Sequence, residues 1–269
     1  MKPINGDTRL IGFFGSTYKT SKMYAMYNNA FEALDLNYRY IPCVVNDLEK
    51  AVEGIRHMGF AGIGITVPYK ESIIPFLDEL EDDAQKVGAV NVVINRDGKL
   101  IGGNTDGQGA ICALEEQMLL SGKKITLLGA GGAAKAIAYS LSELDCSVTI
   151  INRDQKKAQQ LAHVTKADYA RFEQLSEAVK HADILINATT VGMYPNISEC
   201  LVDAPLILPS MTVMDIVSNP RETELVKRAL ARGARVVPAE RMLLHQGVIK
   251  FKYFTGQEAP IEVMEKTLI

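Results

Sequence analysis

The feature that most constrains the fold of this 269-residue chain is a glycine-rich loop between an apolar segment and a helix-forming one. Residues 125–128 are mainly apolar, and they are followed by Gly129-Ala130-Gly131-Gly132-Ala133-Ala134. Gly129 permits a tight strand-to-helix turn, Gly131 lets the backbone approach a pyrophosphate, and the small Ala134 lets the helix pack on its strand. The sequence therefore predicts a dinucleotide site of the Rossmann type, with phosphate at the N-terminus of the helix.

Segments typical of strands alternate with helical periodicity along nearly the whole chain, which predicts an α/β protein of parallel βαβ units. We expect a helix over 21–34 with Ser21 as its cap, and a tight turn at Asp97-Gly98. A change of motif near residue 105 separates two domains, of which the second is the Rossmann-type domain. The expected strands are 10–14, 38–43, 62–66, 90–94, 125–128, 148–151, 184–187, 213–216 and 235–237.

The composition argues against several classes of protein. With 47% hydrophobic residues the chain can bury a substantial core, and a net charge of −3 without a basic run disfavours a nucleic-acid partner. The most apolar stretch, 125–141, contains glycines and Lys135, so no membrane-spanning helix is expected, and the first residues lack a secretory signal. The four cysteines form no Cys-x-x-Cys pair and the four histidines are dispersed. We therefore expect no metal site, and a reducing, cytoplasmic location.

The residues after the second expected strand of the Rossmann-type domain indicate the cofactor. An enzyme specific for NAD usually has a carboxylate there for the ribose hydroxyls, whereas this chain has Asn152-Arg153. Arg153 can pair with a 2′-phosphate and stack on adenine, and Lys156 and Lys157 follow within one turn. Asp154 could contact a ribose or cap the next helix, and we favour the cap. The sequence predicts NADP, and use of NAD stays open.

Two short segments upstream of the glycine loop carry residues suited to proton transfer. Lys70 ends the segment 64–70, and Asp106 lies in the segment 103–107. Oxidation of a secondary alcohol requires a group that accepts the hydroxyl proton as hydride departs. Desolvation shifts a lysine toward neutrality and an adjacent carboxylate opposes that shift, so the pair could pass a proton. Taken singly, Lys70 could be an ordinary surface lysine at the start of a helix, and Asp106 could be an ordinary helix cap. Together, the two residues indicate a dehydrogenase.

The order of these segments resembles the shikimate dehydrogenase family across essentially the whole chain. Residues 64–70 resemble the catalytic-lysine segment of that family, residues 88–91 its substrate-asparagine segment and residues 104–106 its catalytic-aspartate segment. Residues 152–153 resemble its NADP-binding segment, residues 187–193 its nicotinamide-side loop and residues 242–246 its closing helix. The resemblance implies a discontinuous substrate-binding domain formed by 1–105 and 239–269. It implies a Rossmann domain formed by 106–238.

The resemblance also implies a role for each matching residue. Lys70 would be the acid/base and Asp106 its partner. Residues that would hold a cyclic hydroxy acid are Ser21, Thr66, Asn91, Thr105 and Gln246, with Ser21 on the ring carboxylate. The expected cofactor contacts are Gly129, Ala130, Gly131, Gly132, Ala133, Asn152, Arg153, Lys157, Thr189, Val191, Met193, Ile216 and Met242. The implied reaction is NADPH-dependent reduction of 3-dehydroshikimate to shikimate, on the route to aromatic amino acids, by a monomer or homodimer.

Several positions depart from the family pattern and leave the identity of the ring acid open. Met23 replaces a carboxylate-binding serine, Gly64 an asparagine, Ser218 a tyrosine and Arg241 a glycine. Side chains that could supply replacement donors are Lys22, Tyr24, Tyr27 and Arg241. Quinate or another polyhydroxylated or amino-substituted ring acid is therefore an alternative substrate, and a non-catalytic NADP-binding sensor is a second alternative.

Overall fold

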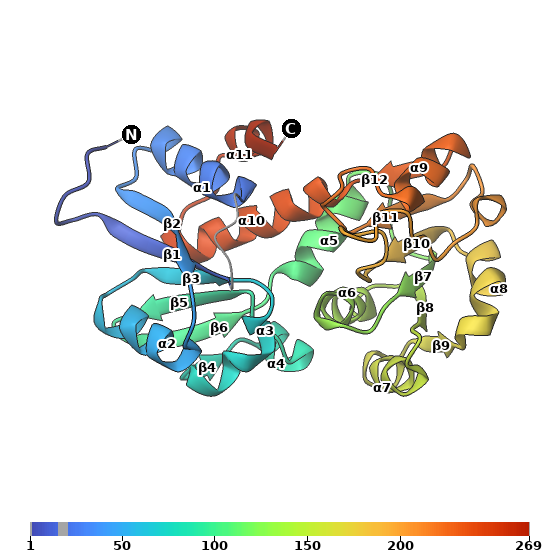
Figure 1. Ribbon diagram of the computed structural model, residues 1–269, viewed down its shortest axis with the longest axis horizontal. Helices are drawn as coiled ribbons and strands as arrows, with labels where there is room; N and C mark the ends of the chain where they lie inside the picture. The colour runs from blue at the N-terminus through green and yellow to red at the C-terminus, as the bar shows by residue number, and fades with distance from the viewer. Residues whose placement is uncertain (1, 16–20, 269) are drawn as a thin grey trace. The chain divides into compact units, whose positions relative to one another are not determined.

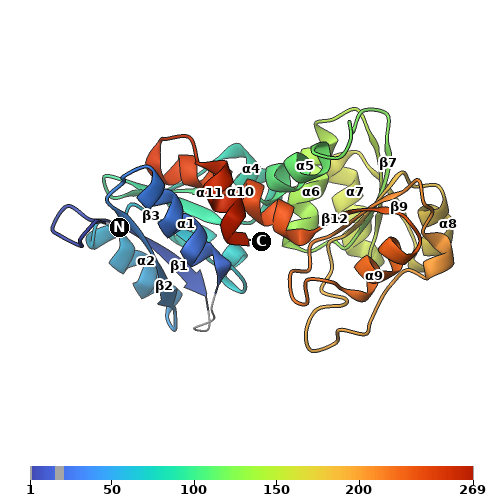
Figure 2. The same cartoon turned by 90° about the horizontal axis from the view of Figure 1, so that it is seen from above.

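The computed structural model describes residues 2–15 and 21–268, which form two compact α/β units (Figures 1 and 2). Unit 1 comprises Met1–Thr105 and Leu244–Ile269, and unit 2 comprises Asp106–Leu243. Each unit is built around its own six-stranded sheet. The two units divide after Thr105 and after Leu243; the domain boundaries expected from the sequence are at 105 and 238.

The sheet of unit 1 has the strand order β2-β1-β3-β5-β6-β4 and mixes parallel with antiparallel pairs. β1 runs parallel to β2 and β3, whereas β5 runs antiparallel to β3 and β6. The strands are β1 (Arg9–Gly15), β2 (Tyr38–Val44), β3 (Gly62–Ile65), β4 (Glu79–Leu80), β5 (Val92–Arg96) and β6 (Lys99–Gly103). The helices are α1 (Lys22–Ala33), α2 (Leu48–His57), α3 (Tyr69–Ser72), α4 (Asp82–Val87), α11 (Ile261–Leu268) and the larger part of α10 (Ala239–Thr255).

Helices cover both faces of this sheet (Figure 1). On one face, Val52 and Ile55 of α2 belong to the same buried cluster as Ile63 of β3. On the opposite face lie α1, α10 and α11. The buried residues of α1 recur at the spacing of an amphipathic helix, which explains why this segment folds as one: they are Met23, Met26, Tyr27, Ala30 and Phe31.

Aromatic rings connect α1 to the sheet and to α10. Tyr27 stacks on Tyr40 of β2 with 4.4 Å between ring centroids, and Phe31 stacks on Phe251 of α10 at 5.4 Å. Gly64 in β3 makes this packing possible, because a Cβ atom at that position would collide with the Tyr40 hydroxyl. The departure of Gly64 from the family pattern is thus explained by the Tyr40 ring, which occupies the space that a larger side chain would need.

The sheet of unit 2 has the order β12-β11-β10-β7-β8-β9 with every neighbouring pair parallel. This is the arrangement of a Rossmann-type nucleotide-binding domain. Its strands are β7 (Lys124–Leu128), β8 (Ser147–Ile151), β9 (Asp168–Ala170), β10 (Ile184–Asn187), β11 (Thr212–Asp215) and β12 (Arg235–Val237). Its helices are α5 (Asp106–Glu115), α6 (Gly132–Ser142), α7 (Gln155–Thr165), α8 (Leu175–Lys180), α9 (Glu224–Ala231) and the first turn of α10.

Two buried clusters lie on opposite faces of this parallel sheet. Apolar residues of α5, α6 and α7 pack on one face, and residues of α8 and α9 pack on the other. Gly107 lets α5 approach α6 closely, because a Cβ atom there would collide with Ser140 and the backbone of Ala136. Burial on both faces explains why the central strands β7, β8, β10 and β11 are mainly apolar and show little alternation.

The α/β fold class predicted from the sequence is confirmed, and three details differ. Unit 1 has a mixed sheet where parallel units were expected, because β5 runs antiparallel to β3 and the Asp97-Gly98 turn, which was expected, joins β5 to β6 as a hairpin. The strand expected at 90–94 begins two residues later, at Val92; the Val90 N–H donates to the Lys70 carbonyl of α3 and not to a neighbouring strand. β4 and β9 were not expected, because Glu79–Leu80 and Asp168–Ala170 are short, contain no apolar run and bury none of their residues fully.

Candidate active site

Antiparallel pairing gathers the predicted substrate residues of unit 1 at one edge of its sheet. β3 ends just before Thr66, β5 begins just after Asn91, and β6 ends just before Asn104 and Thr105. The register aligns these ends, because Gly64 pairs with Val92 and Val92 with Gly103. Segments far apart in sequence therefore present polar side chains at the same place.

Asn91, Thr105 and Gln246 form a buried network of hydrogen bonds at this edge. The Asn91 Oδ1 accepts from the Thr105 backbone N–H at 3.0 Å, and its Nδ2 donates to the Thr105 hydroxyl at 3.2 Å. Asn91 Nδ2 also lies 3.4 Å from Gln246 Oε1, and the Thr105 hydroxyl donates to the Gln246 carbonyl at 3.4 Å. All three side chains are buried. Such a network fixes the orientation of its amide groups and is suited to recognising hydroxyl groups.

Lys70 lies in the short helix α3, which directly follows β3 and Thr66. Its carbonyl accepts from the Val90 N–H at 2.7 Å, and the neighbouring Tyr69 hydroxyl donates to the Val45 carbonyl at 2.7 Å. These bonds fix the backbone of the turn, and the Lys70 side chain is half-buried. Asp106 is buried, follows Thr105 directly and begins α5.

At the expected carboxylate-binding end, Ser21 caps α1, because its Oγ accepts from the Met23 N–H at 3.2 Å. Met23 is buried in the packing of α1. Residues 16–20, which precede Ser21 in this segment, lie outside the described residues. Of the alternative donors, Lys22 donates to the Leu268 carbonyl at 2.5 Å, and the buried Tyr27 hydroxyl donates to the Gly247 carbonyl at 3.2 Å.

In unit 2, the predicted cofactor residues follow the carboxyl ends of parallel strands, where this fold binds nucleotides. Gly129 adopts a φ of 117°, and a Cβ atom there would lie 2.8 Å from the Ala188 carbonyl oxygen. By contrast, a Cβ atom at Gly131 or Gly132 would meet no atom within 4 Å. The glycine turn therefore leaves open space at the N-terminus of α6, which fits the approach of a pyrophosphate.

Beyond β8, cationic side chains gather on the first turn of α7. Asp154 is the helix cap, since its Oδ1 accepts from the backbone N–H groups of Lys156 and Lys157 at 3.1 and 3.3 Å. Asn152 Nδ2 donates to the Asp154 carbonyl at 3.0 Å, and Arg153 is exposed. The Asp154 carboxylate is thus engaged by the helix, and the exposed cations around it fit a 2′-phosphate.

The loop after β10 is shaped by a buried carboxyl group. Thr189 donates to Asn187 Oδ1 at 2.6 Å and accepts from the Val191 N–H at 3.1 Å. Asn187 Nδ2 in turn donates to Asp215 Oδ1 at 3.0 Å, and the Thr223 hydroxyl donates to Asp215 Oδ2 at 2.6 Å. The expected nicotinamide-side residues follow on from this frame: Val191 and Ile216 are half-buried, Met193 is exposed, and Met242 is buried in α10.

Burial raises the pKa of Asp215 above its ordinary value of 3.8, and its donors Thr223, Val217 and Asn187 oppose that shift without cancelling it. The contribution of Asp215 to stability is therefore complete below about 3.8 and is lost as the pH rises through its folded-state pKa. Relative to Asp215→Asn, which does not titrate, the wild-type free energy of unfolding is expected to fall as the pH rises above this value. Urea unfolding of both proteins across a pH series measures the free energy of unfolding of the wild type minus that of the variant. A value that stays constant or rises with pH would contradict the prediction.

Arg241 and Ser218 depart from the family pattern in ways that the structure clarifies. Arg241 Nε donates to Glu116 Oε2 at 2.6 Å, and a second bond joins the same two side chains through Nη2 and Oε1. This forked pairing orients the guanidinium toward α5 and Glu116. Ser218 is exposed in the loop after β11.

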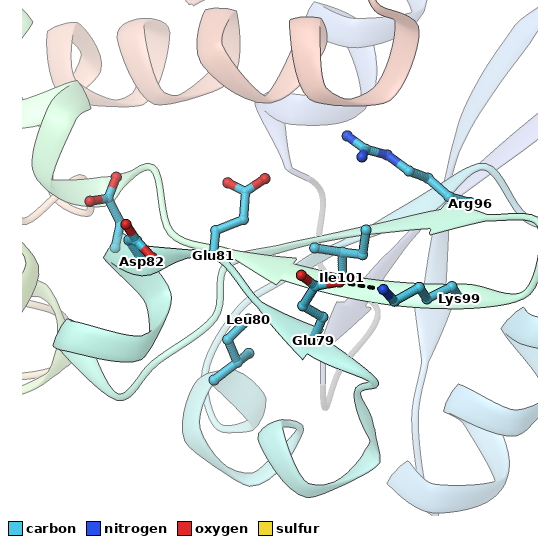
Figure 3. A pocket seen from close by; sticks show the side chains of 8 residues that line it. Glu79, Leu80, Glu81, Asp82, Arg96, Lys99 and Ile101 are labelled. Atoms are coloured by element: carbon cyan, nitrogen blue, oxygen red, sulfur yellow. Dashed lines mark ion pairs between the residues drawn. The ribbon is translucent and has the colours of Figure 1, made fainter.

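A separate hollow of about 580 Å³ lies along the β4 edge of unit 1 (Figure 3). Four carboxylates and two cations line it together with Leu80 and Ile101: they are Glu79, Glu81, Asp82, Asp83, Arg96 and Lys99. Lys99 pairs with Glu79 at 2.5 Å, and Glu81 accepts a hydrogen bond from the Tyr253 hydroxyl. Figure 3 shows Glu81 and Arg96 pointing to the same side of the sheet. The excess of carboxylates disfavours an anionic ligand, and none of the predicted substrate residues lines this hollow.

Neither a metal cluster nor a membrane helix occurs in the described part of the chain. No three His, Cys, Asp or Glu side chains there could hold a metal ion. Across residues 2–15 and 21–268, no helix combines the length and apolarity that crossing a membrane requires. Burial raises the pKa of all four cysteine thiols, unlike that of an activated catalytic cysteine.

A Rossmann-type sheet with an open glycine turn, together with a buried polar network beside a lysine, defines the class of nicotinamide-dependent dehydrogenases. Comparison with known protein families leads to the same class. Residues 13–93 match the shikimate dehydrogenase substrate binding domain, 112–234 the shikimate / quinate 5-dehydrogenase domain and 240–269 the shikimate 5′-dehydrogenase C-terminal domain. The chain belongs to the shikimate dehydrogenase family.

Individual relatives match over nearly their whole length. The protein named shikimate dehydrogenase (NADP(+)) of Pyrococcus furiosus is 41% identical over 267 residues, which cover 99% of this chain and 97% of the relative. A crystal structure of a shikimate dehydrogenase in complex with NADP+ is 38% identical with a TM-score of 0.92, covering 99% and 96% of the two chains. The shikimate 5-dehydrogenase of Listeria monocytogenes, crystallised with shikimate and NAD, is 34% identical with a TM-score of 0.92, covering 100% and 99%.

Proposed function

We propose that this protein is an NADP-dependent shikimate dehydrogenase, which interconverts shikimate and 3-dehydroshikimate. The observation that carries the proposal is the edge of the unit 1 sheet, where the Lys70 turn and the network of Asn91, Thr105 and Gln246 come together. This edge belongs to a chain that is 41% identical to a shikimate dehydrogenase over almost its full length. Lys70 and Asp106 are the proposed proton-transfer pair.

The proposed roles follow from the chemistry of each side chain. Bound NADP supplies the hydride acceptor when the alcohol is oxidised. Lys70 accepts the hydroxyl proton as the carbonyl forms, and the Asp106 carboxylate stabilises the resulting ammonium. In reduction, Lys70 returns the proton to the alcohol oxygen. Substrate hydroxyls are held by Thr66, Asn91, Thr105 and Gln246, and the ring carboxylate is held by Ser21.

The proposed cofactor site uses the edge of the parallel sheet in unit 2. The pyrophosphate would occupy the open space at Gly131 and Gly132, next to the N-terminus of α6. The 2′-phosphate would pair with Arg153 and Lys157, and Asn152 supports their turn through its bond to the Asp154 carbonyl. NAD lacks that phosphate, so its use would rest on the remaining contacts. The nicotinamide would contact the group formed by Thr189, Val191, Met193, Ile216 and Met242.

A second candidate substrate is quinate or another ring acid. The buried Met23 and the exposed Ser218 leave the carboxylate end with fewer donors than the family pattern has, which favours a changed substrate. A non-catalytic NADP sensor is a weaker candidate, because sensing gives no reason to retain both Lys70 and Asp106. The two candidates are distinguished by whether any ring acid is turned over.

Kinetics with shikimate and quinate, each with NADP and with NAD, test this proposal. We expect kcat/KM to be highest for shikimate with NADP, by about tenfold or more over the NAD pair, since the lost phosphate contacts involve charged groups. The reduced nicotinamide is followed by its absorbance. Binding of NADP without turnover of any ring acid would support the sensor, and preferential turnover of quinate would support the changed substrate.

The cytoplasmic location is also part of the proposal. The structure describes Cys43, Cys112, Cys146 and Cys200 as free cysteines, which fits a reducing compartment. Cell fractionation followed by detection of the protein tests the location. Light scattering of the purified protein would decide between a monomer and a homodimer.

A further inference from the structure

Helix α10 carries a buried lysine that neither the sequence nor the family resemblance singled out. Lys250 is 4% exposed, although lysine is almost never fully buried in proteins unless it is paired. It lies one helical turn after Gln246, so the two side chains share a face of the helix. A buried cation beside a proposed substrate residue requires a physical explanation.

The bond between these side chains has a defined direction. Lys250 Nζ donates to Gln246 Oε1 at 3.0 Å, and Asn91 Nδ2 lies 3.4 Å from the same oxygen. An ammonium group has donors and no acceptor, so it can bond only the oxygen of a carboxamide. If the Gln246 amide were flipped, its NH₂ group would face the donors of both Lys250 and Asn91. The two neighbours therefore select a single orientation of the Gln246 amide.

We propose that Lys250 is a positioning residue for substrate recognition, which fixes the Gln246 carboxamide so that its NH₂ group donates to a ring hydroxyl. The inference rests on the proposed function, which assigns Gln246 to the substrate. The ammonium also polarises the amide, which strengthens the N–H groups as donors. The ligand that this arrangement takes is a hydroxylated ring acid whose oxygen at this position accepts a hydrogen bond.

The test is Lys250→Met, which keeps most of the unbranched side chain and removes its charge and donors. The Gln246 amide that Lys250 leaves behind is neutral and not an opposite charge, so the variant is expected to fold. We expect KM for shikimate to rise about tenfold while kcat and KM for NADP change by less than about twofold. Lys250→Arg should recover part of the loss, because it restores a cation. Lys252→Met is the matched control, since Lys252 is an exposed lysine on the same helix, and its kinetics should equal those of the wild type.

A double-mutant cycle shows whether Lys250 acts through Gln246. If it does, adding Lys250→Met to Gln246→Ala should change KM for shikimate little beyond the effect of Gln246→Ala alone. Additive effects, or an unchanged KM in Lys250→Met, would overturn the inference. If Lys250→Met does not fold, the same cycle is run with Lys250→Gln, which also removes the charge.

A readout without turnover separates this inference from the proposed function. The side-chain NH₂ resonances of Gln246, assigned by their loss in Gln246→Ala, are followed by NMR in the ligand-free protein. We expect Lys250→Met to shift them and Lys252→Met to leave them in place. Absence of ring-acid turnover by the wild type would refute the proposed function alone, whereas unshifted Gln246 resonances would refute the role of Lys250.

Discussion

Replacing Lys70 with alanine is expected to lower kcat/KM for shikimate about a thousandfold, which corresponds to roughly 4 kcal/mol of transition-state stabilisation. The reason is that no other group is proposed to accept the hydroxyl proton as hydride leaves. Affinity for NADP should change by less than about twofold, because the proposed cofactor contacts lie in unit 2 and do not include Lys70. Initial rates and calorimetric titration of NADP measure the two quantities.

The control for this variant is Lys50→Ala, since Lys50 is an exposed lysine of the same unit that pairs with Asp47. Its kinetics should equal those of the wild type. If Lys70→Ala retained wild-type activity, the assignment of Lys70 as the acid/base would be wrong. A fall in NADP affinity as large as the fall in turnover would point to a general loss of structure.

Replacing Arg153 with alanine is expected to raise KM for NADP about thirtyfold and to leave KM for NAD nearly unchanged. A hydrogen bond between charged groups contributes about 1.5–3 kcal/mol, which is roughly tenfold to hundredfold in affinity. Only NADP carries the 2′-phosphate that Arg153 would pair with, so the effect should be selective. The measurement is the ratio of kcat/KM values for the two cofactors.

Lys227→Ala is the matched control for Arg153→Ala, because Lys227 is an exposed cation on α9 of the same unit. It should leave both cofactors unaffected. An equal loss with NADP and NAD would place Arg153 on the adenine or the shared ribose and not on the phosphate. If kcat/KM were unchanged with both cofactors, the assignment of Arg153 to the cofactor site would be wrong.

The glycine loop, the parallel sheet after it and α1 were predictable because their signals are local. Gly129 needs its positive φ, and the five buried residues of α1 recur at helical spacing. The Asp154 cap was likewise visible in the sequence, since a carboxylate before a helix has a known local role. Local sequence patterns therefore predicted most of the fold.

Features that depend on tertiary contacts could not be predicted from the sequence. β4 is a two-residue strand held by pairing with β6, and Arg241 meets Glu116 across 125 positions of the chain. Lys250 was missed because a lysine in a helix is normally interpreted as an exposed residue. The available signal was its spacing of four from Gln246, but that spacing alone does not predict burial.

The most direct test of the account is the absorbance of reduced nicotinamide after wild-type protein is mixed with shikimate and NADP+. The account predicts that absorbance rises in the wild type and that the rise is about a thousandfold slower in Lys70→Ala. Folded wild-type protein that binds NADP+ and yields no reduced cofactor with shikimate would contradict the proposed function. An equal rise in both proteins would contradict the proposed chemistry.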